Sequence, residues 1–163
     1  MTPASPDINR TIRREAAASA AANFVINGAI QAALLSGKGP HRISADSIAS
    51  REATVFGAAV PMAIALAAIG ATITFFAFRK KAAAAGWATP ALLARPYVPF
   101  GLGQALSASL VVFGALVATG VVWQRLFGEV TVGTPVAALL AGLVAAGTSW
   151  YASRRTARAL LRE

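Results

Sequence analysis

The chain has 163 residues, of which 56% are hydrophobic and only 13% are charged, and its mean hydropathy is +0.61. A soluble domain carries roughly 25% charged residues, so this composition excludes an ordinary soluble protein and indicates an integral membrane protein. The net charge of +9 comes from basic residues clustered at the ends of apolar runs, which is typical of topological signals, so we expect no nucleic-acid partner.

The chain begins with a basic segment, residues 5–14, in which Ser5, Pro6 and Asp7 are typical of a helix start. Ile8 and Ile12 lie four residues apart among arginines, which predicts a short amphipathic helix at the membrane surface. The first span, about residues 15–36, has no charge after Glu15 and is long enough to cross a bilayer core of roughly 30 Å. This run is longer than a signal-peptide core, so we expect it to be retained.

Three carboxamide side chains lie within this first span, at Asn23, Asn27 and Gln31. Because four residues turn a helix by about 400°, they fall within an arc of about 80° and share one face. An unpaired polar group in hydrocarbon costs on the order of a few kcal/mol. This amide stripe therefore has to meet protein or water, and not lipid.

The remainder of the chain predicts three further spans. A polar loop follows Ser36 and leads to a second span that contains Pro61, which is expected to bend the helix or free a carbonyl group. Small and aromatic residues then form a connector in the membrane interface. Thr134-Pro135 is typical of a cap followed by proline at a helix start. The boundaries are about 53–78, 100–123 and 135–153 for the spans and 154–163 for a basic C-terminal tail.

The distribution of Lys and Arg predicts the orientation. Four spans place eleven of the fifteen basic residues on the side of both termini and four on the other side. The positive-inside bias therefore puts both termini in the cytoplasm. We expect an all-α protein with a single membrane domain, residues 1–163, built as an up-down bundle of four transmembrane helices.

The polar residues of the spans lean toward the predicted cytoplasmic half. One interpretation is a polar cavity open to the cytoplasm and closed near Asn27 and Gln31, with Pro61 as a candidate hinge. The other is hydrogen bonding between closely packed helices, with small pairs such as Gly142 and Ala146 as packing surfaces. The polar residues in question are Ser19, Asn23, Thr72, Thr74, Gln104, Ser107, Thr148 and Ser149.

Several kinds of chemistry lack their usual residues. No Asp, Glu, Lys, Arg or His lies inside the four predicted spans, which disfavours proton-coupled transport. We find no catalytic motif and no cysteine, so we expect no enzyme activity, no catalytic residue and no cofactor. His41, Asp46 and Glu52 are candidates for a metal or substrate site in the first outer loop, but such loop residues are usually solvated and we expect no metal.

Four short stretches carry a resemblance to known sequences. They are Asn23 to Ile30, Ser44 to Ser47, Thr54 to Pro61 and Trp123 to Arg125. In these stretches the chain resembles small four-span bacterial membrane proteins of uncharacterised function, some of which are labelled permeases. The resemblance implies an inner-membrane location and transfers no site residues.

Two functions remain open at this stage. The first is a small permease, or a permease component, for a neutral or weakly polar solute, using Asn23, Asn27, Gln31 and Gln104 as hydrogen-bonding groups. The second is a non-catalytic membrane subunit or scaffold that binds another membrane protein or lipid through its first helix. Four helices enclose little room, so the expected partners are the lipid bilayer and either further copies of the chain or another membrane protein.

Overall fold

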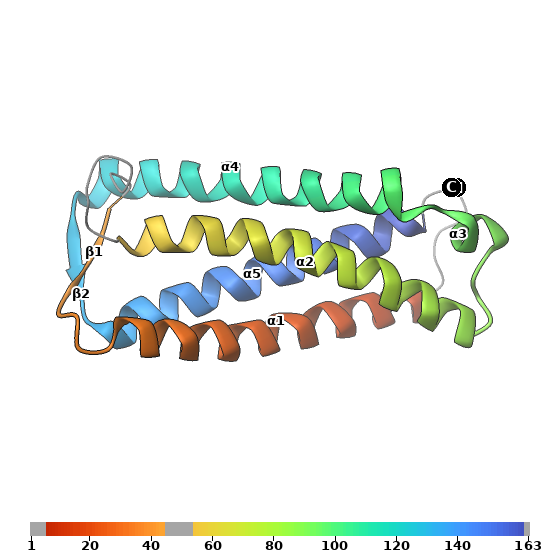
Figure 1. Ribbon diagram of the computed structural model, residues 1–163, viewed down its shortest axis with the longest axis horizontal. Helices are drawn as coiled ribbons and strands as arrows, with labels where there is room; N and C mark the ends of the chain where they lie inside the picture. The colour runs from red at the N-terminus through yellow and green to blue at the C-terminus, as the bar shows by residue number, and fades with distance from the viewer. Residues whose placement is uncertain (1–5, 45–53, 162–163) are drawn as a thin grey trace.

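Four long helices form the structure, a computed structural model that describes residues 6–44 and 54–161 (Figure 1). They are α1 (Pro6–Leu35), α2 (Val55–Ala84), α4 (Leu102–Phe127) and α5 (Thr134–Leu160). Each is long and apolar enough to cross a membrane. The fold thus fits the polytopic helical membrane protein that the composition predicts.

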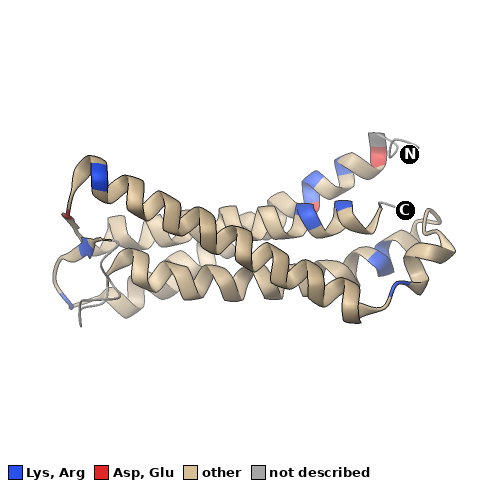
Figure 2. Cartoon of the chain, turned by 90° about the horizontal axis from the view of Figure 1, so that it is seen from above, with Lys and Arg blue, Asp and Glu red and all other residues tan. Residues whose placement is uncertain are grey.

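Successive long helices run in opposite directions along a common axis, as the predicted up-down order requires (Figure 1). Both termini lie at the same end, and Lys and Arg gather at the two ends of the bundle with few charges between them (Figure 2). We call the end that holds the termini the terminal end and the opposite end the loop end. That the terminal end lies in the cytoplasm stays a prediction.

Three of the long helices, α1, α2 and α5, extend further toward the terminal end than the predicted spans. The basic segment predicted to lie on the membrane surface forms the first turns of α1 without a break. Ile8 and Ile12 from this segment pack against a core cluster that includes Phe78 and Leu160. Burial of this apolar edge holds the basic turns against the bundle, while their arginines point to solvent.

Two short strands form at the loop end, where only loops were predicted. β1 (His41–Ile43) pairs antiparallel with β2 (Val130–Val132), and His41 lies opposite Val132. The β-branched residues of this stretch favour an extended conformation, but a run of three is too short to predict a strand. The all-α expectation therefore needs a correction for this ribbon, which joins the two loops at this end.

The helix starts are set by caps. The Thr54 hydroxyl accepts a hydrogen bond from the Gly57 amide at 3.0 Å at the start of α2. The Thr89 hydroxyl accepts one from the Leu92 amide at 3.1 Å and begins the short helix α3 (Pro90–Ala94). Thr134, predicted as a cap, is instead the first residue of α5 and follows Gly133 in the cap position.

The central helix of the bundle is α5, which packs on both α1 and α2, while α4 packs mainly on α2. Small side chains make this possible: the buried positions of α2 include an alanine every four residues, Ala59, Ala63, Ala67 and Ala71. At the contact of α1 with α5, a Cβ atom on Gly142 would lie 3.0 Å from the backbone oxygen of Phe24. The two backbones therefore approach each other closely at this glycine.

The most peripheral helix is α1. None of the residues in its most apolar stretch is fully buried in the chain, whereas half of the corresponding stretch of α5 is buried. Its outer face carries exposed Val25, Ile26 and Ile30. In a membrane this face meets lipid tails or a second protein.

Candidate functional site

An elongated groove lies between α1 and α2 in the terminal half of the bundle, and α5 forms its floor. Its volume is about 530 Å³, which falls in the range of roughly 300–1,000 Å³ for small-molecule sites. Its lining on α2 extends from Leu66 to Ala84, a length of about 27 Å at a rise of about 1.5 Å per residue. We refer to it as the α1–α2 groove.

The walls of the groove are mainly apolar, and the groove opens toward the side of the bundle. Ile69 and Ile73 line it from α2 although 54% and 61% of their surface is exposed. Both side chains therefore reach the outer surface of the bundle, at a depth where a membrane has hydrocarbon. The groove lies in the half of the molecule toward which the polar residues lean, but it is mainly apolar and opens sideways, unlike the polar cavity of the first interpretation.

A serine hydroxyl without a partner lies in the floor of the groove. Ser149 is only 1% exposed, lines the groove from α5, and its Oγ forms no hydrogen bond with any residue that the structure describes. Leaving a buried hydroxyl unsatisfied costs about 1–3 kcal/mol. Ser153 of α5 and Ser19 of α1 also line the groove, so hydrogen-bonding groups lie in its floor and in one of its mainly apolar walls.

Charged residues mark the terminal end of the groove. Glu15 of α1 and Lys81 of α2 form an ion pair, and both line the groove together with Lys80. The two side chains are about half exposed, at 52% and 50%. This pair links the two helices that form the walls, and we call it the mouth pair.

The amide stripe borders this groove. Asn23 lines it and donates a hydrogen bond to the backbone oxygen of Ser19 at 3.0 Å. Asn27 donates to the backbone oxygen of Asn23 at 3.0 Å and lies 3.3 Å from its side-chain oxygen. All three stripe residues, Gln31 included, are partly buried. Each of the two asparagines thus donates at least one hydrogen bond within α1 itself.

Gln31 lines a second, much smaller cavity near the loop end. This cavity has a volume of about 30 Å³, which is space for about one water molecule, and His41 and Thr54 also line it. His41 is only 7% exposed and its Nε2 lies 3.1 Å from the Thr134 hydroxyl. The interpretation of His41 as a solvated loop residue was wrong, because pairing of β1 with β2 carries the ring inward.

Two predicted site residues lie apart from the stripe. Gln104 is partly buried on α4, on the far side of α2 from α1, and lines neither cavity (Figure 1). Pro61 is exposed, and α2 continues through it as one helix. Its role as a hinge stays a prediction.

Three arginines at the terminal end are engaged in packing. Arg79 donates to the backbone oxygens of Arg95 and Leu93, and Arg95 donates to the backbone oxygen of Ala159 at 2.9 Å. Arg155 donates to the hydroxyls of Tyr151 and Ser107 at 2.8 and 2.7 Å. These side chains tie the connector and α4 to the bundle, beyond the topological role that the sequence suggests.

Within residues 6–44 and 54–161 there is no group of three His, Asp or Glu residues that could hold a metal ion. Asp46 and Glu52, predicted as partners of His41, lie outside the described residues.

The comparisons with known proteins return no match to this chain, whether to a family model, a curated protein or a solved structure. The function is therefore inferred from the geometry of the α1–α2 groove and its surroundings.

Proposed function

We propose that this chain is a non-catalytic inner-membrane protein that binds one amphipathic, lipid-like molecule in the α1–α2 groove. The observation that carries the proposal is the shape and polarity of the groove. It is about 27 Å long, apolar along its walls, open toward the surface that would face lipid, and charged at one end only. An apolar chain with a polar head has the same distribution of polarity.

The unpaired hydroxyl of Ser149 supports the same proposal. A fully apolar ligand would leave this group unsatisfied, whereas an ester or carbonyl oxygen would accept its proton once the side chains that cover the Oγ atom shift aside. The occupant therefore carries a hydrogen-bond acceptor along its length, as glycerolipids do next to their headgroup.

The test is a substitution that fills the groove without changing the charge of the protein. Ala77 is exposed and lines the groove, so Ala77→Trp places an indole in it. The matched control is Ala115→Trp, which adds the same side chain to an exposed position of α4 outside the groove. We expect native mass spectrometry in mild detergent to show one retained phosphatidylcholine on the wild type and the control, and none on Ala77→Trp. Equal retention by the two tryptophan variants would refute the proposal.

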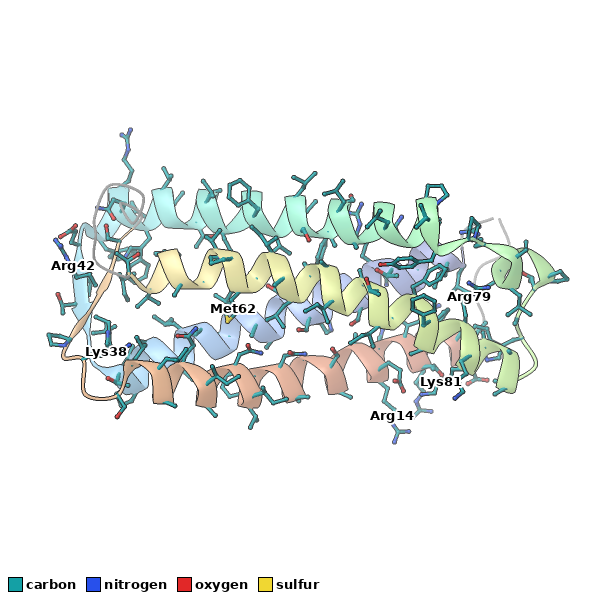
Figure 3. The ribbon with its side chains drawn as sticks, in the orientation of Figure 1. Arg14, Lys38, Arg42, Met62, Arg79 and Lys81 are labelled. Carbon is teal, nitrogen blue, oxygen red and sulfur yellow. The ribbon has the colours of Figure 1, made fainter. Side chains whose placement is uncertain are left out.

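A second candidate, a permease for a neutral or weakly polar solute, is favoured by the position of the amide stripe. Asn23 lines the groove and Gln31 lines the small cavity, so the stripe runs between the two cavities. Met62 points from α2 to the side on which α1 and α5 lie, at a level between the two cavities (Figure 3). A solute path along this line would have to pass Met62.

The two candidate functions differ in whether water reaches Asn27. Because the chain has no cysteine, Asn27→Cys creates a single thiol. A water-filled path makes this thiol reactive toward a charged, water-soluble maleimide in the isolated protein, and a lipid-filled groove leaves it unreactive. Purification from the native membrane then shows whether further copies of the chain or a foreign membrane protein stay bound.

A further inference from the structure

We infer that the occupant of the α1–α2 groove is an anionic phospholipid, whose headgroup binds Lys80 and Lys81 in competition with Glu15. This inference rests on the proposed function and adds the charge of the ligand. It starts from the position of the mouth pair at the end of the groove that lies at the predicted membrane interface.

The basic side chains at the terminal end differ in whether they are available to a ligand in the groove. Arg79, Arg95 and Arg155 donate to backbone oxygens and hydroxyls of the bundle, so their guanidinium groups are directed at protein. Lys80 and Lys81 instead line the groove. Figure 3 shows Lys81 on the same side of the bundle as Arg14, and Arg79 away from both. The lysines are therefore placed where a headgroup of a bound lipid would lie.

Positive charge predominates around the mouth pair. The first turns of α1 carry three exposed arginines, and Asp7 and Glu15 are the only acids of that helix. With the two groove lysines, positive charge exceeds negative charge at this end, and Figure 2 shows that blue predominates over red on the segments of the terminal end. An anionic headgroup is attracted by such a cluster, at about 1 kcal/mol per basic residue near a membrane surface. The arginines are Arg10, Arg13 and Arg14.

A bound headgroup can replace Glu15 as the partner of Lys81. The mouth pair is half exposed on both sides, and ion pairs of this kind contribute about 0.2–1 kcal/mol. A phosphate group that is held in the groove by its own acyl chain acts at high effective concentration. It can therefore displace Glu15 from Lys81, which also releases α1 from α2 at this point.

The experiment compares phosphatidylglycerol with phosphatidylcholine of identical acyl chains, titrated onto the full-length protein in mild detergent and followed by native mass spectrometry. We expect tighter binding of phosphatidylglycerol. Glu15→Gln removes the competing carboxylate and strengthens phosphatidylglycerol binding about fivefold, and Lys81→Gln weakens it about fivefold. Both changes have a much smaller effect on phosphatidylcholine, because its choline cation offsets the charge of its phosphate. Lys38→Gln, at the loop end in Figure 3, is the matched control and leaves both lipids unchanged.

Each outcome has a separate meaning. If both lipids bind equally and Glu15→Gln changes neither, the inferred charge selectivity is wrong, while loss of both lipids in Ala77→Trp still supports the groove. If Ala77→Trp retains both lipids, the proposed function fails and this inference fails with it. Because the mouth pair is exposed and weak, both charge variants are expected to fold, and their melting temperatures in detergent check this.

Discussion

The Ser149 hydroxyl is buried in a place where water is scarce, and it has no partner within residues 6–44 and 54–161. A serine that only stabilised the bundle would donate to a neighbouring carbonyl, as Ser109 does to the backbone oxygen of Ile64 at 3.1 Å. The two buried serines therefore have opposite roles for stability. Ser109 stabilises the contact between α4 and α2, whereas Ser149 is left unsatisfied and would be paired by the ligand proposed above.

Alanine at each position tests this difference. Ser149→Ala is expected to keep or raise the melting temperature of the purified protein, because it removes an unsatisfied group. Ser109→Ala is expected to lower stability by about 0.6 kcal/mol, the typical value of a hydrogen bond between membrane helices. Ser149→Ala also weakens lipid retention in the titration, and Ser109→Ala does not. A destabilised Ser149→Ala protein would mean that the hydroxyl has a partner.

At the scale of elements, α1 depends on one close contact. It packs mainly on α5, and the two backbones lie close together where Phe24 and Gly28 of α1 face Gly142 of α5. Because Gly142 lacks a side chain, the α1 backbone can lie directly against α5. This contact sets the distance of α1 from α5 and thereby the width of the α1–α2 groove.

Gly142→Ala is expected to push α1 away from α5, since the added Cβ would lie 3.0 Å from the Phe24 oxygen and 3.1 Å from its ring. The matched control is Gly147→Ala in the same helix, where nothing lies within 4 Å and alanine favours the helix by up to about 1 kcal/mol. We expect a lower melting temperature and weaker lipid retention for Gly142→Ala, and neither loss for Gly147→Ala. Equal melting temperatures would contradict the close contact.

Much of the element level was predictable, and the reasons are physical. Apolar runs of membrane length predicted four helices, and the amide spacing predicted the partly buried face of α1. The continuation of α1 through its basic segment was not predictable from the sequence. Ile8 and Ile12 pack against residues of α2 and α5, and this contact exists only in the folded bundle. The burial of His41 likewise depends on the pairing of β1 with β2, two strands about 90 residues apart in sequence.

The candidate site was predictable only in part. Asn23 lines the α1–α2 groove and Gln104 lines neither cavity, and the role of both as hydrogen-bonding groups for a solute stays a prediction. Ser149 appeared in the sequence only as one of several polar residues at that depth. Its lack of a partner depends on what α1 and α2 place around it, which no local pattern records.

For the whole molecule, the orientation in the membrane is the prediction with the widest consequences. If the terminal end lies in the cytoplasm, the charged mouth of the groove faces the cytoplasmic leaflet, which is rich in anionic lipid. An opposite orientation would present the mouth to the outer leaflet. The choice of ligand and the topology are therefore linked.

Single cysteines in the cysteine-free chain test the orientation. Lys38→Cys at the loop end and Arg158→Cys at the terminal end both replace exposed residues. In intact cells, a membrane-impermeant maleimide is expected to label Lys38→Cys and to leave Arg158→Cys unlabelled until the membrane is disrupted. The reverse pattern would place both termini outside and overturn the cytoplasmic assignment.

The ribbon of β1 and β2 has a mechanical consequence for α1. It ties the loop that follows α1 to the loop that precedes α5, and the Thr134 hydroxyl donates to the Leu35 backbone oxygen at 3.4 Å beside it. The carboxyl end of α1 is thereby anchored, while its amino end is held by apolar contacts and one exposed ion pair. Any rotation of α1 has its pivot near Leu35 and its largest amplitude near Ile8. Amide hydrogen exchange along the helix should then become faster toward its amino end.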